Sequence, residues 1–393
     1  MLNRHLLRGK AMQTLYSLEH SQRAAYSIAI DLIQHSLEPA WNVDKSTVDF
    51  EEIAKKRQSA QDILERNYQN DTIRFDASVH PDVKKIALEA FTFYKNQLSK
   101  DYNFLSKQLE SQFNKMYDAY LMLLLLLIDL SDFARQEEIR IKKSLAYQNQ
   151  VIVLEGDFKL KNNQFCEVLR QSQPLQKEIL KRNLSWNNYR EIVHNLFRQV
   201  IRNEEFYKQY DQAPTTDFEQ DRTFITELLR QVILKNESIQ TVLEEIDPHW
   251  VENAAIVRDM LNKNLKKTTP NFFELTPLAL NWEEDFLFVK EILHLTWKHQ
   301  LELERIIDQK VENWELERLA QLDRIIIRMA ICEMLHFPSI PVKVTINEYI
   351  ELSKRYSTPK SKQFVNGLLD AISQDLLQQG KIRKTGRGLI DNK

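Results

Sequence analysis

Apolar residues recur three and four positions apart through most of this 393-residue chain, the spacing that gathers them on one face of an α-helix. The first run comprises Leu6, Leu7, Ala11, Leu15 and Leu18. Later runs cover residues 83–148, 157–171, 185–210 and 217–236, and then 283–299, 300–312, 315–335, 344–356 and 361–379. Strict alternation of apolar and polar residues, the mark of half-buried strands, does not dominate any of them. The pattern predicts an all-α protein.

Helix signals frame these runs. Ser46 and Asp49 can cap a helix that ends near Asn67, and Pro81 suits the first turn of the next helix. The most apolar stretch runs from Ala119 to Leu130 and contains five consecutive leucines. It is shorter than the roughly 18 apolar residues that a membrane span requires. We therefore expect a buried helix there and no association with a membrane.

Composition narrows the function classes. The chain has six glycines and holds neither G-x-G-x-x-G nor the P-loop pattern, which cradle phosphates with glycine backbone. A nucleotide-dependent enzyme built on a parallel sheet is therefore not expected. Two cysteines, Cys166 and Cys332, lie far apart and give neither a disulfide framework nor zinc-ligand spacing, which fits a reducing compartment.

The overall net charge of −2 is unevenly distributed. Residues 1–24 carry +3 and residues 334–393 carry +5, so residues 25–333 carry −10. Basic termini around an acidic middle are compatible with an unevenly charged, solvated surface. They are equally compatible with two ends that converge on a polyanion while the middle stays clear of it.

Three ordered blocks carry a specific pattern. The first block is Arg8-x-Lys10-Ala11-x-Gln13-x-Leu15-Tyr16. The second is Trp314-x-x-x-Arg318-Leu319-x-x-x-Asp323-Arg324-x-Ile326-x-Arg328-x-Ala330-x-x-Glu333. The third is Ile340-Pro341-x-Lys343-Val344-x-Ile346-Asn347-Glu348-x-Ile350-Glu351-Leu352-x-Lys354, followed by Ser361-x-x-Phe364-Val365-Asn366-Gly367-x-Leu369-Asp370. Together they resemble the NusB family of transcription antitermination proteins.

The resemblance covers residues 1–21 and 283–379 and implies an all-α fold of two small helical bundles. Residues 22–282 have no counterpart in the short family members. Their apolar content predicts an ordered helical insertion after the first helix, of unknown role. Residues 380–393 are polar and basic, which predicts a disordered tail.

The resemblance also implies a function. Family members bind the boxA element of nascent ribosomal RNA leaders together with the ribosomal protein NusE, and this helps RNA polymerase pass terminators. The chain is thus expected to be a cytoplasmic, RNA-binding transcription antitermination factor. It would be no enzyme, and would use no cofactor and no metal.

The residue types at the matching positions suit single-stranded RNA, which proteins hold by stacking on aromatic rings, by hydrogen bonds to base edges and by cations on phosphates. On the first helix, Tyr16 is expected to stack on a base and Gln13 to offer an amide. Arg4 and Arg8, four residues apart, are expected to face phosphates from one side of that helix.

The family's RNA surface also includes the beginning of its last helix. Lys360, Ser361 and Lys362 occupy that place here, where free backbone N–H groups favour an anion. The family pattern further suggests Asp323 and Arg324 as the side facing NusE. Without the resemblance, Tyr16 would better suit a half-buried core position than a stacking platform, and Arg4 and Arg8 would suit a solvated basic face.

Two other functions are compatible with the sequence. In the first, the acidic insertion dominates and the chain is a helical interaction protein whose RNA binding is weak or lost. In the second, Glu191-x-x-His194, Glu291-x-x-His294 and Glu333-x-x-His336 supply ligands of a di-iron carboxylate bundle.

Overall fold

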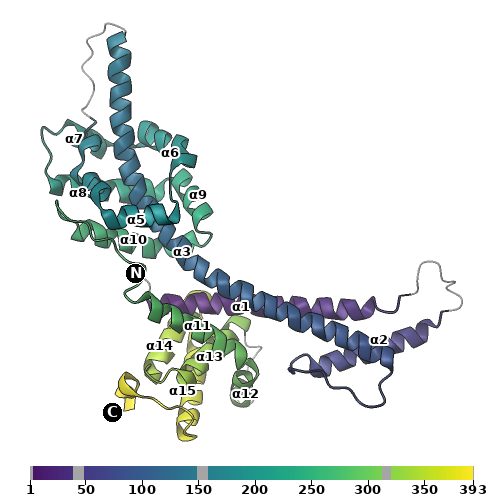
Figure 1. The fold of residues 1–393 in the computed structure, drawn as a ribbon. Helices are drawn as coiled ribbons and strands as arrows, with labels where there is room; N and C mark the ends of the chain where they lie inside the picture. The colour runs from purple at the N-terminus through teal and green to yellow at the C-terminus, as the bar shows by residue number, and fades with distance from the viewer. Residues whose placement is uncertain (1–2, 39–47, 148–157, 312–319, 393) are drawn as a thin grey trace. The chain divides into compact units, whose positions relative to one another are not determined.

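The computed structural model describes residues 3–38, 48–147, 158–311 and 320–392. These residues are almost entirely helical (Figure 1), and within them the sole β pairing is an isolated bridge between Thr269 and Phe272. The predicted all-α class is confirmed. No helix among the described residues is long and apolar enough to cross a membrane.

The α-helices follow in chain order. They are α1 (Arg4–Gln34), α2 (Phe50–Asn67), α3 (Pro81–Tyr147), α4 (Gln164–Gln171), α5 (Gln173–Arg182), α6 (Arg190–Asn195), α7 (Glu205–Gln212), α8 (Phe218–Glu227), α9 (Glu237–Ile246), α10 (Trp250–Lys267), α11 (Trp282–Lys298), α12 (Gln300–Val311), α13 (Gln321–His336), α14 (Val342–Tyr356) and α15 (Ser361–Gln378). Asp49 caps α2 by accepting a hydrogen bond from the Glu52 backbone N–H, as predicted, and α3 begins at Pro81.

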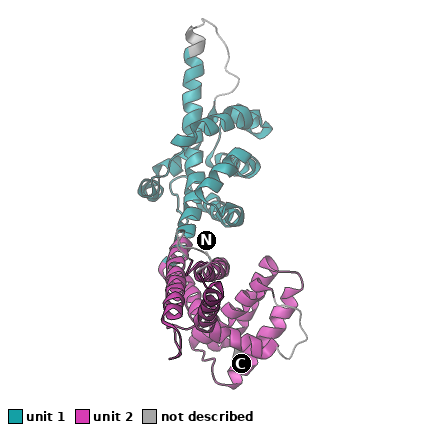
Figure 2. Ribbon diagram, turned by 90° about the vertical axis from the view of Figure 1, so that its right-hand side faces the viewer, with its two compact units in different colours: residues 1–3, 110–282 teal, residues 4–109, 283–393 magenta. Residues whose placement is uncertain are grey.

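The chain divides into two compact units, coloured separately in Figure 2. Unit 1 comprises residues 1–3 and 110–282, and unit 2 comprises residues 4–109 and 283–393. The boundary at residues 109 and 110 falls inside α3, so this one helix contributes residues to both units.

Helix α13 is the centre of unit 2 and packs against α1, α12, α14 and α15. Every residue from Ile325 to Met334 is buried, so the helix is enclosed on all sides. An enclosed helix must pair its polar side chains with other protein groups, because water cannot reach them. The partners of its buried Arg328 and Glu333 therefore fix how neighbouring helices lie.

A second core of unit 2 joins the later turns of α1 to α2 and the start of α3. Ala25, Ala29 and Ile33 of α1 lie in it together with Leu64 of α2 and Tyr94 of α3. The first helix therefore does not end near residue 21, where the sequence placed the start of the insertion, but continues to Gln34. Residues 22–109 lie in the same unit as residues 283–393.

Unit 1 surrounds the apolar part of α3. The side chains of Leu121, Leu123 and Leu127 are fully buried, which explains the leucine run without a membrane. In this core the Trp186 indole N–H donates to the Met122 carbonyl at 2.9 Å. Burial of the Tyr117 hydroxyl in this core raises its pKa to about 12.

Two helices of unit 1 contain a π-turn of the same local sequence. Residues 196–200 and 228–232 both form a π-turn, and each is followed by a short 3₁₀ turn, at 201–203 and 233–235. Both π-turns share the pattern Leu-x-Arg-Gln-Val-Ile, counting the residue that follows. A π-turn inserts one extra residue and changes which side chains face outward.

The C-terminal segment differs from the predicted disorder. Gly380, at φ +65°, ends α15, and the N–H groups of Gly380 and Lys381 donate to the Leu377 and Leu376 carbonyls, a Schellman cap. Beyond it Ile382 is buried, and the Lys384 ammonium donates to the Phe337 carbonyl at 3.0 Å. These contacts compensate the loss of conformational entropy when the segment becomes ordered, which its polar composition alone would not do.

Substituting Gly388 tests this docking. A Cβ atom at Gly388 would lie 2.1 Å from the Pro338 carbonyl oxygen, so Gly388→Ala must push the segment away. We expect faster hydrogen exchange at the Thr385 N–H, which donates to the same carbonyl. Gly386→Asn is the control, because Gly386 has open space and Asn tolerates its φ of +53°. Equal exchange in both variants would contradict the docking.

Glu137 makes the stability of unit 1 dependent on pH. Hydrogen bonds from Arg140 and Arg198 lower the pKa of this carboxyl to about 2, despite its burial. A lowered native pKa stabilises the fold above the ordinary pKa of about 4.5, and the gain disappears as the pH falls toward 2. Glu137→Gln should therefore lower the urea midpoint at pH 7 and approach the wild type near pH 2. A pH-independent deficit would argue against the pairing.

Candidate nucleic-acid interface

Arg8, in the second turn of α1, lies in the core of unit 2. Its side chain is 3% exposed, and its Nε and Nη2 each donate to a Glu333 carboxylate oxygen at 2.8 Å. Its third nitrogen, Nη1, lies 3.3 Å from Glu348 of α14. The guanidinium also faces the rings of Phe288 and Tyr349. Arg8 therefore connects α1 with α11, α13 and α14.

The carboxylate of Glu333 is the acceptor of this cluster. Besides Arg8, it accepts hydrogen bonds from the Thr345 hydroxyl at 2.8 Å and from the Tyr349 hydroxyl at 3.2 Å. Burial would lower the pKa of Arg8, but the Glu333 carboxylate raises it above its ordinary value. Burial and the same carboxylate raise the pKa of Tyr349. Arg8 is therefore charged, and Tyr349 is neutral.

Arg8 consequently has a structural role in this arrangement, because its nitrogens are occupied by carboxylates and shielded from solvent. Arg4, one turn earlier, is partly exposed. It donates to Glu284 at 2.5 Å and lies over the Phe288 ring at 5.1 Å. Although they are four residues apart on one face, the two arginines differ in access: a phosphate can reach Arg4 but not Arg8.

Tyr16 and Gln13 are half-buried on α1. The Tyr16 ring packs edge to face with His20, one turn later, at a centroid distance of 4.4 Å. His20 itself is exposed. The sequence analysis did not single out His20, although its i,i+4 spacing from Tyr16 places both rings on one helix face.

At the beginning of α15, the three predicted residues separate into two kinds. Lys360 and Lys362 are exposed, whereas Ser361 is buried. The Ser361 hydroxyl donates to Asp323 of α13 at 2.7 Å and lies within 2.9 Å of the hydroxyls of Ser357 and Thr358. Ser361 therefore attaches α15 to α13, and the lysines remain available to an anion.

The two predicted partner-facing residues also differ. Asp323 is buried as the acceptor from Ser361. Arg324 is about one third exposed and pairs with Glu304 and, at 3.1 Å, with Asp308 of α12. Arg324 can meet a partner at its exposed edge, whereas Asp323 organises the helix contact beneath.

A second buried ion pair of α13 escaped the sequence analysis. Arg328 contacts Glu19 of α1 and lies 3.2 Å from Glu304 of α12. Gln321 donates to the same Glu19 at 2.8 Å. A signal was present: Arg328 lies within a helix whose other residues are mostly apolar, and such a charge requires a partner.

The Glu-x-x-His pairs considered as iron ligands make other contacts. His194 stacks on Phe133 at 3.9 Å, His294 is hydrogen-bonded to the Tyr102 hydroxyl at 3.0 Å, and His336 stacks on His299. Glu333 accepts from Arg8. In the described part of the chain, no three His, Cys, Asp or Glu side chains gather in a way that could hold a metal ion.

Comparison with known proteins finds similarity to one protein family in the C-terminal part of the chain. A sequence profile described as the NusB family matches residues 254–374. The matched range contains α11, α12, α13, α14 and most of α15. It also contains most of α10, which the structure places in unit 1, and it excludes α1.

Individual relatives agree with the profile. The chain is similar to transcription antitermination proteins NusB of Salinibacter ruber (48% identity, 26% of this chain, 64% of the relative) and Chloroherpeton thalassium (44%, 28% and 50%). It is also similar to the NusB protein of Koribacter versatilis (39% identity, 24% of this chain, 64% of the relative). The similarity thus spans between half and two thirds of each relative.

Removing Arg8 tests its structural role. Arg8→Ala leaves Glu333 charged, buried and without its cation, a change that typically costs about 3–5 kcal/mol of unfolding free energy. The partly exposed Arg4 is the control, and Arg4→Ala should cost less than about 1 kcal/mol. Because Glu333→Gln removes the uncompensated charge, the double variant should lose less than the sum of both single losses. Urea unfolding measures the four variants and the wild type; equal stability of Arg8→Ala and Arg4→Ala would contradict the assignment.

Proposed function

Because residues 254–374 of this chain match the NusB family profile, we propose that the protein is a transcription antitermination factor that acts on ribosomal RNA operons. It binds a boxA-like single-stranded leader RNA together with the NusE ribosomal protein, as part of an RNA polymerase complex. It acts in the cytoplasm and without catalysis. The known relatives that are named NusB antitermination proteins support this proposal.

The observation that carries the proposal is the Arg8–Glu333 ion pair. The first helix lies outside the matched range, yet Arg8 joins it to Glu333 and Glu348, two residues of the family pattern inside that range. A buried bidentate pair fixes both the position and the rotation of α1. This supports treating α1 as part of the RNA-binding unit.

The proposed RNA surface keeps the accessible members of the predicted set. Tyr16, with its neighbour His20, offers aromatic faces to an unstacked base, and Gln13 lies one turn before Tyr16. Arg4 is the accessible arginine of α1. Lys360 and Lys362 add positive charge at the N-terminus of α15, where unpaired backbone N–H groups favour phosphate.

Arg8 and Ser361 support this surface from beneath, and Asp323 does the same through its hydrogen bond to Ser361. For the NusE partner we retain Arg324, whose pairing with Glu304 and Asp308 leaves one edge open. Asp323 acts there indirectly, by fixing α15 against α13.

One observation favours the alternative of an interaction protein with weak RNA binding. Of the four cations in the predicted set, Arg8 is buried and Arg4 is already paired with Glu284. Fewer free cations on this surface mean fewer phosphate contacts and hence lower affinity. Measured affinity for RNA therefore separates the two functions.

The test is fluorescence anisotropy of a labelled boxA-like leader RNA against a scrambled RNA, at several salt concentrations, with and without NusE. We expect tighter binding of the boxA-like RNA when NusE is present. Equal affinity for both RNAs under that condition would refute the sequence-specific function and favour the alternative.

Substitutions within the same assay test the surface. Tyr16→Ala should weaken binding by about 5- to 150-fold, since base stacking contributes about 1–3 kcal/mol. The exposed Ser17→Ala on the same helix is its control and should change nothing. Lys360→Ala with Lys362→Ala should reduce the salt slope by about 1.4, or 0.7 per lost phosphate contact. An unchanged slope would show that the N-terminus of α15 is not part of the RNA-binding surface.

A further inference from the structure

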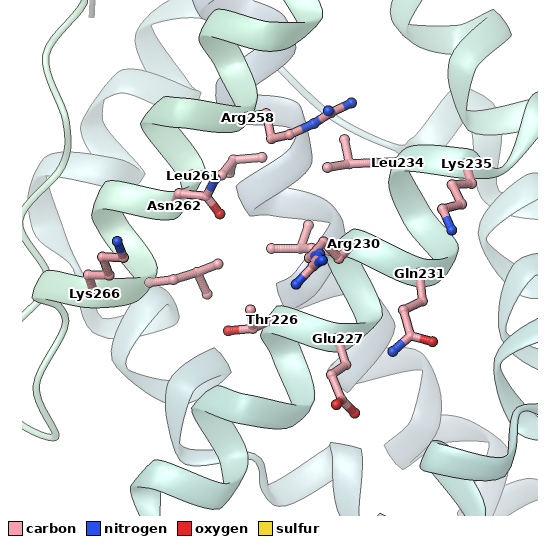
Figure 3. A pocket seen from close by; sticks show the side chains of 12 residues that line it. Thr226, Glu227, Arg230, Gln231, Leu234, Lys235, Arg258, Leu261, Asn262 and Lys266 are labelled. Atoms are coloured by element: carbon pink, nitrogen blue, oxygen red, sulfur yellow. The ribbon is translucent and has the colours of Figure 1, made fainter.

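Unit 1 contains a groove that the family resemblance does not account for. It has a volume of about 800 Å³ and lies between the α8 region, with the turns that follow it, and α10 (Figure 3). Its walls carry four basic side chains, from Arg230, Lys235, Arg258 and Lys266. Among the described residues that line it, Glu227 is the carboxylate, so the lining carries a net charge of about +3.

The four cations are available to a ligand. All four are exposed, and none of them makes an ion pair or a side-chain hydrogen bond to another described residue. Other arginines of unit 1 form ion pairs with carboxylates: Arg222 pairs with Glu219, and Arg182 pairs with Asp118. Four unpaired cations around one groove therefore stand out from their surroundings.

The two π-turns provide an internal comparison. Arg198 and Arg230 occupy the same position of the shared Leu-x-Arg-Gln-Val-Ile sequence, each inside a π-turn. Arg198 is used internally: it pairs with the buried Glu137 at 2.8 Å and lies over the Phe133 ring. Arg230 has no such partner among the described residues and faces the groove. The same local backbone thus carries a structural arginine at position 198 and an arginine without a described partner at position 230.

The floor of the groove decides which kind of anion fits. The leucines Leu229, Leu261 and Leu265 are buried, whereas the cationic and amide side chains around them are exposed and meet a ligand first. An acidic amphipathic helix would need exposed apolar anchors in its groove. A nucleic-acid backbone needs cations and amide donors instead, and Gln231 and Asn262 supply amides beside the four cations. No aromatic ring is among the described lining residues, which favours phosphate contact over base stacking.

We propose that this groove binds the phosphate backbone of single-stranded RNA without sequence preference, as a second RNA contact in the inserted part of the chain. The proposal rests on the proposed RNA-binding function for the choice of RNA as the anion. It gives residues 22–282 a role: they add affinity that is independent of the boxA-like sequence.

The test uses full-length protein and a labelled oligo(U) RNA that lacks a boxA-like element. Arg230→Glu with Arg258→Glu reverses two groove charges. Lys177→Glu with Lys181→Glu, both exposed on α5 and outside the groove lining, makes the same change in net charge. We expect at least a 10-fold loss of oligo(U) affinity for the groove variant, less than a 2-fold loss for the control, and a salt slope smaller by about 1.4 for the groove variant.

Circular dichroism checks that both variants remain helical, and the milder Arg230→Gln with Arg258→Gln should show an intermediate loss. Equal losses in groove and control variants would overturn the proposal, because net charge alone would explain them. Polyglutamate competing as strongly as oligo(U) would also overturn it, in favour of an acidic protein ligand.

The same variants distinguish this proposal from the proposed function. If the groove variant loses oligo(U) binding while the wild type shows no preference for boxA-like over scrambled RNA, the groove stands and sequence-specific antitermination fails. If the wild type prefers boxA-like RNA and the groove variant binds oligo(U) unchanged, sequence-specific antitermination stands and the groove proposal fails.

Discussion

The enclosure of α13 is the constraint on which unit 2 depends. A buried charged side chain must be paired inside the protein, and α13 has three such groups. Glu333 holds α1 through Arg8, Arg328 contacts α1 and α12, and Asp323 holds α15 through Ser361. The apolar residues around them make the helix bundle stable, and these three contacts set its register.

The need to pair buried charges over long sequence distances explains which site residues could be identified from the sequence. Periodicity locates helices well, because one apolar face must be buried whatever lies opposite it. The start of α3 at Pro81 and the cap at Asp49 follow from local chemistry and were predicted. Whether an individual arginine is buried or exposed cannot be read from the residues next to it in the sequence. Arg4 and Arg8 share a face, yet a carboxylate 325 residues further along decides that Arg8 is buried.

The inserted residues show a similar limit. Their acidic average suggested a region that avoids polyanions, but charge averaged over hundreds of residues hides local exceptions. Unit 1 neutralises many of its cations internally and leaves four unpaired at one groove. Only the fold brings Arg230 and Arg258 to opposite walls of one groove. Both π-turns have the sequence Leu-x-Arg-Gln-Val-Ile, so this local sequence does not decide that Arg198 is paired internally and Arg230 is not.

The continuation of α1 beyond residue 21 bears on how such a chain can change in evolution. Ala25, Ala29 and Ile33 are buried by α2 and by the start of α3, so these inserted helices complete the burial of the first helix. A single deletion of residues 22–282 would remove this layer together with the end of α1. A deletion that kept the whole of α1 but removed α2 and the start of α3 would instead expose Ala25, Ala29 and Ile33, so these two helices and the later turns of α1 can be lost only together.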